Sequence, residues 1–196
     1  MAAMEYSKQP TRKIPRKPSP ERLERAALHY LERFATSSDN LRRVLLRKID
    51  RALPHHPEVE RGAAAGWVDD LVARYLRAGL LDDQAYAEAR AASLHRRGSS
   101  TRKIRMNLMQ KGVEEETIDA ALGDLAERIE GDPELTAAIA LARRRRLGPY
   151  RPAAARADNR DRDLSTLARG GFSYDTARKV IEAEDIAALE ALAADS

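Results

Sequence analysis

The sequence predicts an all-α protein of three tandem three-helix repeats, forming an elongated, curved, right-angled helical array behind a disordered basic N-terminal tail. Three observations support this prediction. Ala, Leu, Arg and Glu are abundant and aromatic residues make up only 5% of the chain, a composition that favours helices over sheets. Apolar residues recur at the three- and four-residue spacing of one helix face. A helix end followed by Gly and an apolar residue occurs in tandem.

Residues 1–18 form the predicted tail, in which prolines lie among cations and no apolar run is present. Such a segment cannot bury enough surface to fold, so we expect it to be disordered. Residues 1–20 hold five basic side chains and one acidic side chain, a net charge of +4 that equals the charge of the whole chain. The rest of the chain is therefore neutral overall, and the tail accounts for the pI of 9.5. We expect the tail to attract phosphates in a salt-sensitive manner.

The first predicted repeat spans residues 19–81. Ser19 suits the cap of a helix that starts with Pro and Glu. The segment 50–66 then interrupts the helical spacing with two Pro and two Gly residues, so we expect a loop insertion at about 50–66. Helical spacing resumes at Trp67 and Leu71.

The second predicted repeat spans residues 82–131 and contains the segment GSSTRKIRMNLMQKGV. Ser99 or Ser100 can cap a short helix here, because a hydroxyl accepts an otherwise unpaired backbone N–H. Gly112 suits the left-handed stop of that helix. Acidic residues then start a further helix, where the positive end of the helix dipole favours them.

The third predicted repeat spans residues 132–196. Its first helix ends in four consecutive Arg residues, 143–146, and its last helix is expected from Ser173 to about Leu192. The segment LMQKGVEEETIDAAL aligns with LARGGFSYDTARKVI, so that Gly112 falls on Gly171. Repeats of this size bury their apolar faces against their neighbours. The residues expected in the core are Trp67, Leu71, Ile104, Leu108, Leu122, Leu167 and Phe172.

Charge is sorted into blocks along the predicted repeats. Residues 83–112 carry seven basic and two acidic groups, 113–134 carry one and nine, 135–162 carry eight and two, and 163–196 carry three and seven. Such alternation indicates either separate basic and acidic faces or complementary contacts between neighbouring helices. The candidate partner- or nucleic-acid-facing residues are Arg96, Arg97, Arg102, Lys103, Arg105, Lys111, Arg143, Arg144, Arg145, Arg146 and Arg169.

The sequence does not indicate an enzyme. It has no Cys, its four His residues are scattered, and it contains neither a phosphate-binding Gly-rich loop nor a nucleophile elbow. Asp82 and Asp83 resemble a helix cap with a first-turn acid more than a pair of metal ligands. We therefore expect no catalytic residue, metal or cofactor. No apolar run is long enough to cross a bilayer, and we expect a soluble, cytoplasmic protein.

Three segments together resemble the RecX family of bacterial regulators: GLLDDQAYAEA, then HRRGSSTRKIRMNLMQKGV, then RGGFSYDTARKVI. The resemblance covers about residues 22–187. It implies three tandem three-helix repeats and a monomer that binds the RecA recombinase filament on single-stranded DNA and restrains its activity in recombination, repair and the SOS response. The insertion at 50–66 and Gly170, where the family often has a basic residue, depart from the family pattern.

Two other functions also fit the predicted helices. Short helix pairs with Gly turns suit a helix-turn-helix DNA-binding transcription regulator, and helical repeats can serve as a scaffold for another protein. The tandem recurrence of the Gly stop and the neutral folded body favour the RecX-like regulator. Weak direct DNA contact through the tail and the basic helices is expected beside RecA binding.

Overall fold

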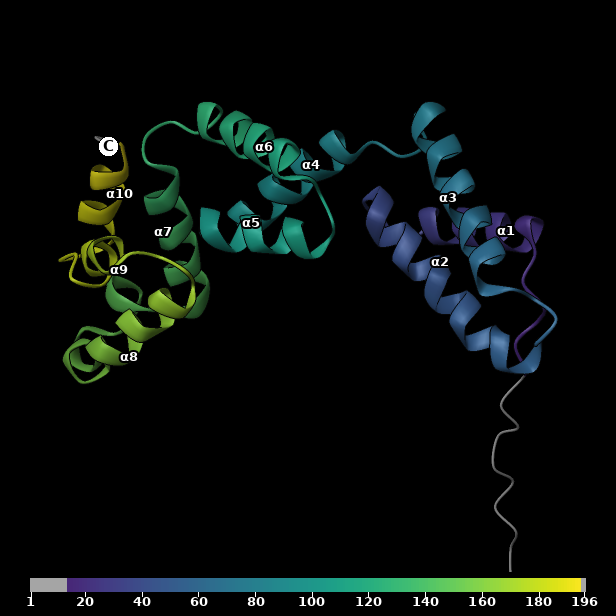
Figure 1. Ribbon diagram of the computed structural model, residues 1–196. Helices are drawn as coiled ribbons and strands as arrows, with labels where there is room; N and C mark the ends of the chain where they lie inside the picture. The colour runs from purple at the N-terminus through teal and green to yellow at the C-terminus, as the bar shows by residue number, and fades with distance from the viewer. Residues whose placement is uncertain (1–13, 195–196) are drawn as a thin grey trace, which may run out of the picture. The chain divides into compact units, whose positions relative to one another are not determined.

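The computed structural model describes residues 14–194, which form ten α-helices, three short 3₁₀ turns and no β-strand (Figure 1). Within these residues the all-α prediction is confirmed. The helices are α1 (Pro20–Leu31), α2 (Ser38–Ala52), α3 (Arg61–Arg77), α4 (Asp83–Arg96), α5 (Thr101–Gln110), α6 (Glu115–Glu127), α7 (Pro133–Arg145), α8 (Arg156–Arg169), α9 (Tyr174–Ile181) and α10 (Ile186–Ala194). The described residues divide into two compact units: residues 14–34 with 41–78, and residues 35–40 with 79–194. The repeat boundaries at 81/82 and 131/132 stay predictions.

Local sequence chemistry sets most helix ends. The Ser19 hydroxyl caps α1 by accepting the Arg22 N–H, and the Ser100 hydroxyl caps α5 by accepting the Lys103 N–H. The predicted glycine stops have positive φ angles, 71° at Gly112 and 90° at Gly171. Glycine adopts this left-handed region without the steric cost that a Cβ atom brings.

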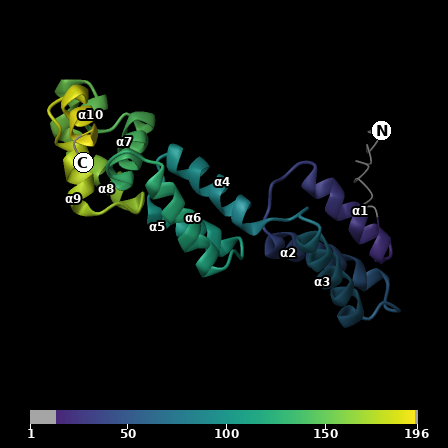
Figure 2. The same ribbon diagram turned by 90° about the horizontal axis from the view of Figure 1, so that it is seen from above.

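Each unit buries its own apolar interior. In the first unit, α1, α2 and α3 bury Leu23, Leu45 and Val68 among other aliphatic side chains. The second unit holds two clusters, one formed by α4, α5 and α6 around Ile104 and Leu108, the other formed by α7 to α10. Figure 2 shows α5 and α6 side by side in the first of these clusters. Six residues of the predicted core are buried, whereas Trp67 is only partly buried.

The expected loop at 50–66 is wrong over most of its length. Helix α2 continues to Ala52 and α3 begins at Arg61. The carboxylate of Glu60 accepts the backbone N–H groups of Gly62 and Ala63 at 2.8 and 2.6 Å. This cap starts α3 ahead of its glycines, so the interruption shrinks to a 3₁₀ turn and a few connecting residues.

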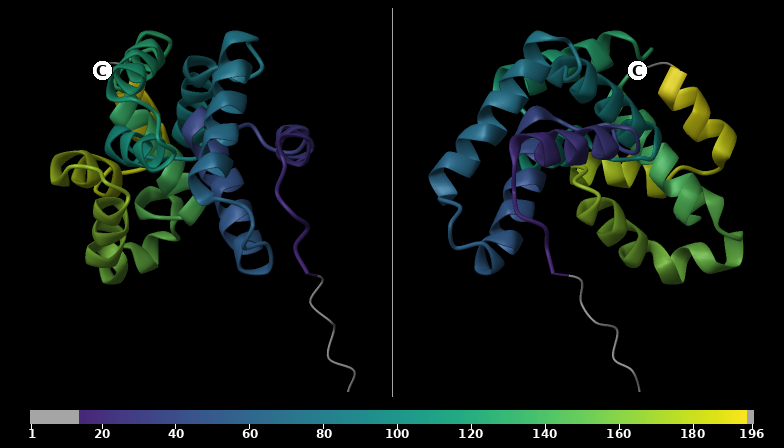
Figure 3. Two further views of the ribbon diagram at one scale, coloured as in Figure 1. Left: turned by 45° about the vertical axis from the view of Figure 1, so that its right-hand side comes forward. Right: turned by 90° about the vertical axis from the view of Figure 1, so that its right-hand side faces the viewer.

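The expected single helix from Ser173 to about Leu192 is also wrong, because the structure divides it into α9 and α10. Figure 3 shows α10 as a separate yellow helix that ends beside the C label. The side chain of Asp185 accepts the Ala188 N–H at 2.8 Å, which caps a new helix start. Leu189 of α10 is fully buried in the cluster of α7 to α9. The tenth helix therefore adds to the nine expected from three repeats.

The predicted tail is described only from residue 14 onward; residues 1–13 lie outside the described residues. The segment 14–18 packs on the first unit, where Pro18 is buried. The carbonyl oxygen of Pro15 lies 2.9 Å from Nε2 of His56, and Lys17 forms an ion pair with Glu58 at 3.2 Å. The prediction of disorder is therefore wrong for these last residues of the tail.

A buried serine joins the two clusters of the second unit. Ser100 is fully buried, and its hydroxyl, while capping α5, donates to the carbonyl of Gly170 at 2.9 Å. The adjacent Gly171 lies so close to Ser100 that a Cβ atom on it would overlap the hydroxyl oxygen. Similarly, a Cβ atom on Gly98 would overlap the backbone of Leu141 in α7. The two glycine turns therefore interlock.

The same hydrogen-bond pattern occurs a second time within this unit. The Ser37 hydroxyl accepts the N–H of Asn40 and donates to the carbonyl of Lys111, the residue before the Gly112 stop. In each case the next N–H binds an acid in the first turn of a helix: Ser38 donates to Asp83 at 2.7 Å, and Thr101 donates to Glu134 at 2.6 Å. One junction design is therefore used twice.

A buried carboxylate fixes the connection between α7 and α8. Asp163 is 1% exposed and accepts hydrogen bonds from Nε and a terminal nitrogen of Arg151, both at 2.7 Å, and from the N–H of Gly148 at 2.9 Å. Burial alone would raise the pKa of the Asp163 carboxyl, but these hydrogen bonds outweigh burial and hold that pKa below its usual value.

We expect Gly171→Ala to lower the free energy of unfolding by at least about 2 kcal/mol, because a left-handed Ala is strained and its methyl group would overlap Ser100. The matched control is Gly123→Ala in α6, where nothing lies within 4 Å of the added Cβ atom and helix propensity should add about 0.5–1 kcal/mol. Urea unfolding of both variants measures the difference. Equal stability of the two variants would show that the turns do not interlock.

We expect Asp163→Asn to cost about 3 kcal/mol at neutral pH, because Arg151 loses its buried ionic partner. Since the folded-state pKa of Asp163 lies below the unfolded value of about 3.9, this carboxylate stabilises the fold above that pH, and the stabilisation is lost as the pH falls through the folded-state pKa. The difference in free energy of unfolding between wild type and variant should thus be smaller at about pH 3 than at neutral pH. A difference that stays constant would contradict the assigned role.

Candidate functional site

Helix α5 presents a mixed cationic and apolar face. It packs inward through Ile104 and Leu108, which are fully buried. Arg102, Met106 and Met109 follow one another at intervals of four and three residues, so they share one face of the helix. All three side chains are exposed, with Met106 at 50% and Met109 at 57%. We call these three residues the α5 stripe.

Sequence reasoning missed the two methionines, although their spacing from Arg102 is visible in the sequence. Met is flexible and polarisable, and it is frequent on surfaces that adapt to a protein partner. A nucleic-acid phosphate would bind only the cation of the stripe, Arg102. The α5 stripe therefore combines chemistry suited to a protein surface with chemistry suited to an anion.

Arg105 differs from its sequence interpretation as an outward, partner-facing cation. Its guanidinium forms ion pairs with Asp119 and with Glu115, the latter at 3.9 Å, both on α6. The basic block of α5 and the acidic block of α6 are thus complementary at this point. Arg105 serves the contact between these two helices.

A basic depression lies where the turn before α5 meets α7 and α8. Gly98, Ser99 and Gly170 form part of its lining, together with Leu141 and Thr166. Its cationic residues come from α5, the end of α7 and one face of α8. They are Lys103, Arg144, Arg145, Arg162 and Arg169. Among the described residues that line it, none is acidic, so the depression concentrates positive potential.

The fold brings these cations together from separate parts of the sequence. The interlocked turns at Ser100 and Gly171 set α5 against the end of α8, and Gly98 allows close approach to α7. Two of the four consecutive Arg residues, Arg144 and Arg145, then reach the same depression as Lys103. The C-terminal end of a helix favours cations, which stabilises this placement on α7.

Arg162 was not singled out in the sequence. It lies on α8 four residues before Thr166 and seven before Arg169, which places all three on one helix face. Within residues 14–194, the only side-chain hydrogen bond that the cations of the depression donate runs from Arg169 to the Thr166 hydroxyl at 3.3 Å. The helical spacing could have revealed Arg162, but its approach to Lys103 depends on tertiary packing.

The remaining predicted cations lie outside the depression. Arg96, Arg97 and Arg146 are exposed. The ammonium group of Lys111 lies 3.4 Å from the side-chain oxygen of Asn40. Arg143 forms an ion pair with Glu190 of α10 at 2.9 Å and stacks on the Tyr150 ring, so its charge is used internally. Of the four consecutive Arg residues, Arg144 and Arg145 therefore line the depression, whereas Arg143 and Arg146 do not.

Asp82, Asp83 and His95 have structural contacts. Asp82 caps α4 by accepting the Ala85 N–H at 2.9 Å, and Asp83 binds Ser38. His95 is buried with Nε2 2.8 Å from the carbonyl oxygen of Pro133. Among residues 14–194 no group of three or more His, Cys, Asp or Glu side chains is arranged to hold a metal ion. In the same range, no helix combines the length and apolar character needed to span a membrane.

Comparison with known proteins agrees with this architecture. Residues 82–122 match the model of the RecX second three-helix domain. The regulatory protein RecX of Myxococcus xanthus is 48% identical over 171 residues, which cover 87% of this chain and 89% of that protein. RecX of Agrobacterium fabrum is 40% identical over 111 residues, covering 54% of this chain and 56% of that protein.

A solved structure shares the fold. The crystal structure of RecX from Lactobacillus salivarius aligns with a TM-score of 0.54 at 18% identity, covering 83% of this chain and 94% of that one. At this identity the likeness speaks for the fold alone. The high identity to the Myxococcus protein over almost the full length of both chains carries the assignment: this chain belongs to the RecX family of regulatory proteins.

Proposed function

We propose that this chain binds the RecA recombinase assembled on single-stranded DNA and inhibits its activity, thereby regulating recombination and DNA repair. Family membership and the resemblance of three sequence segments to RecX regulators support the identity of the partner. In this proposal the chain acts by binding, as a monomer, without a cofactor and without catalysing a reaction.

The observation that carries the proposal is the α5 stripe beside the basic depression. A RecA filament presents both protein surface and phosphates, so a partner gains from offering apolar and cationic groups together. Met106 and Met109 supply adaptable apolar contact, and Lys103 and Arg145, which line the same depression, supply charge. Spread over several elements, these cations act mainly on the encounter rate and salt dependence of binding.

A sequence-reading DNA-binding protein would use its site differently. There, one Arg that contacts a base edge carries about 1–3 kcal/mol of discrimination, and its loss relaxes preference at one position. The exposed methionines of α5 have no role in reading base edges through hydrogen bonds. Their exposure therefore favours the filament-binding proposal over the helix-turn-helix alternative.

The test reverses charge at two exposed positions, Arg102→Glu with Arg145→Glu. We leave Arg105 unchanged because its reversal would break the contact of α5 with Asp119. The concentration needed for half-maximal inhibition of RecA's single-strand-dependent ATPase should rise at least about tenfold, which corresponds to about 1.4 kcal/mol. The matched control, Arg178→Glu with Lys179→Glu on α9, should inhibit as the wild type does.

The apolar part is tested separately by Met106→Ser with Met109→Ser, and Leu80→Ser serves as the control because Leu80 is equally exposed. We expect the double substitution to weaken inhibition and Leu80→Ser to leave it unchanged. Binding of the same variants to a panel of duplex sequences distinguishes filament binding from sequence-specific DNA recognition. Unimpaired inhibition by both double variants, or a sequence preference that one substitution abolishes, would refute the proposal.

A further inference from the structure

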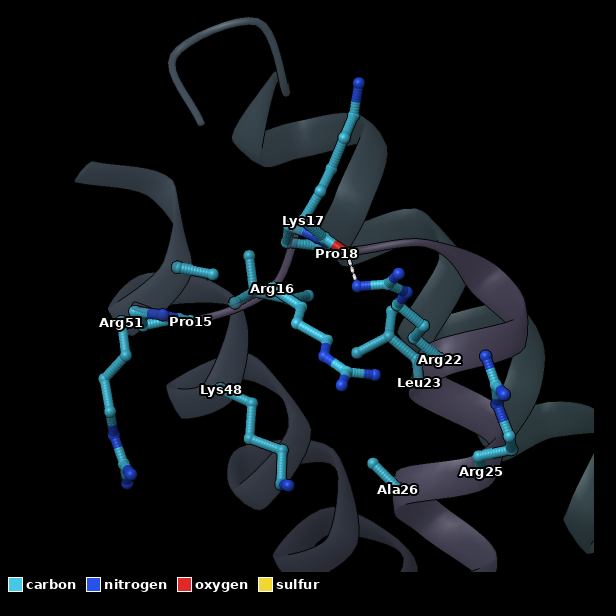
Figure 4. Close-up of a pocket in the computed structure, with 12 residues that line it drawn as sticks. Pro15, Arg16, Lys17, Pro18, Arg22, Leu23, Arg25, Ala26, Lys48 and Arg51 are labelled. Atoms are coloured by element: carbon cyan, nitrogen blue, oxygen red, sulfur yellow. Dashed lines mark hydrogen bonds between the residues drawn. The ribbon is translucent and has the colours of Figure 1, made fainter. Parts of the chain in front are cut away.

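The first unit carries a second basic site, separate in sequence from the depression described above. A recess lies between the segment 15–18, α1 and the end of α2 (Figure 4). Its cationic lining residues are Arg16, Lys17, Arg22, Arg25, Lys48 and Arg51. Its apolar lining residues are Leu23, Ala26, Ile49 and Ala52, with Pro15 and Pro18 at the edge. Among the described residues that line the recess, none is acidic.

The chain segment that forms one wall of the recess is held in place. Pro15 contacts His56, Lys17 forms an ion pair with Glu58, and the carbonyl of Lys17 lies 3.5 Å from a terminal nitrogen of Arg22. The two prolines that flank Arg16 and Lys17 restrict the backbone further. Figure 4 shows that the side chain of Arg16, between these anchors, points into the middle of the recess.

Three of the six cations have no protein partner within residues 14–194: Arg16, Lys48 and Arg51 have neither a hydrogen bond nor an ion pair from their side chains. Like charges gathered in one recess repel one another, and an anion with several charges relieves this repulsion. Four of the six cations are Arg, whose planar fork binds phosphate oxygens in pairs. The recess is therefore suited to a ligand with several anionic groups.

We propose that this recess binds the phosphodiester backbone of single-stranded nucleic acid. The apolar wall distinguishes this ligand from a purely acidic peptide, because sugars and bases lie between the phosphates and contact apolar surface. The concave shape and the inward-pointing Arg16 distinguish it from a duplex, since a single strand enters a recess that a rigid double helix touches only at the rim. The inference does not depend on RecA binding.

The test measures binding of the full chain to a fluorescent oligothymidylate, without RecA, over a range of salt concentrations. The variant Arg16→Gln/Lys48→Gln/Arg51→Gln should bind at least tenfold more weakly at low salt. Each phosphate contact with a single strand contributes about 0.7 to the slope of log affinity against log salt, so the slope should become shallower by about 2. Thermal unfolding checks that the variant remains folded, as expected when repelling surface charges are removed.

The matched control is Arg33→Gln/Arg47→Gln/Arg77→Gln, which removes the same charge from exposed positions of the first unit outside the recess. It should leave the salt slope close to that of the wild type. Equal losses by the two triple variants would overturn the proposal, because general charge would then explain binding. An equal loss for duplex DNA, or displacement of the oligonucleotide by polyglutamate as effective as displacement by DNA, would overturn the assignment to single strands.

Discussion

The hydroxyl of Ser100, placed against Gly170 and Gly171, is the contact on which the second unit depends. One oxygen atom caps α5 and also binds the carbonyl at the end of α8. Residue 171, which follows that carbonyl, has to be glycine, because its φ angle is positive and a side chain would occupy the space of the Ser100 hydroxyl. Ser37 and Lys111 form the corresponding contact elsewhere in the unit. Helix capping and packing between helix groups are thus achieved by the same few atoms.

This junction connects the fold to the surface chemistry. The turn that contains Ser100 also carries Gly98, which lets α7 approach, and is followed by Lys103. As a result, the end of α7 and one face of α8 bring their Arg residues to the same depression. The charge blocks of the sequence serve both purposes that their pattern indicates. Arg105 and Asp119 are complementary between helices, whereas Arg144 and Arg162 add to an uncompensated basic surface.

Sequence reasoning predicted the features that depend on neighbouring residues. The Ser cap and the Gly112 and Gly171 stops were predictable because their chemistry lies within a few residues. The start of α3 was missed because two glycines outweighed the capping carboxylate of Glu60 in the sequence interpretation. The start of α10 after Asp185 was missed because no proline or glycine marks a break between α9 and α10.

The long-range parts of the site were not predictable in the same way. The sequence indicates that Arg105 and Arg162 are charged and helical, but the partners that each meets depend on how α6, α7 and α8 pack. Thus Arg105 and Arg143 of the candidate set are used within the fold, whereas Arg162, which was not a candidate, reaches the depression through tertiary structure. The exposed methionines were overlooked because apolar residues on a short helix are more often buried than exposed.

In the proposed function, α5 and the basic depression together form the surface that binds the RecA filament. Hydrogen–deuterium exchange of this chain, free and bound to RecA on single-stranded DNA, shows which helices this surface includes. We expect slower exchange on binding in α5, at the end of α7 and along α8, with no comparable change in α9. Protection confined to helices that carry neither the α5 stripe nor the depression would contradict the proposal.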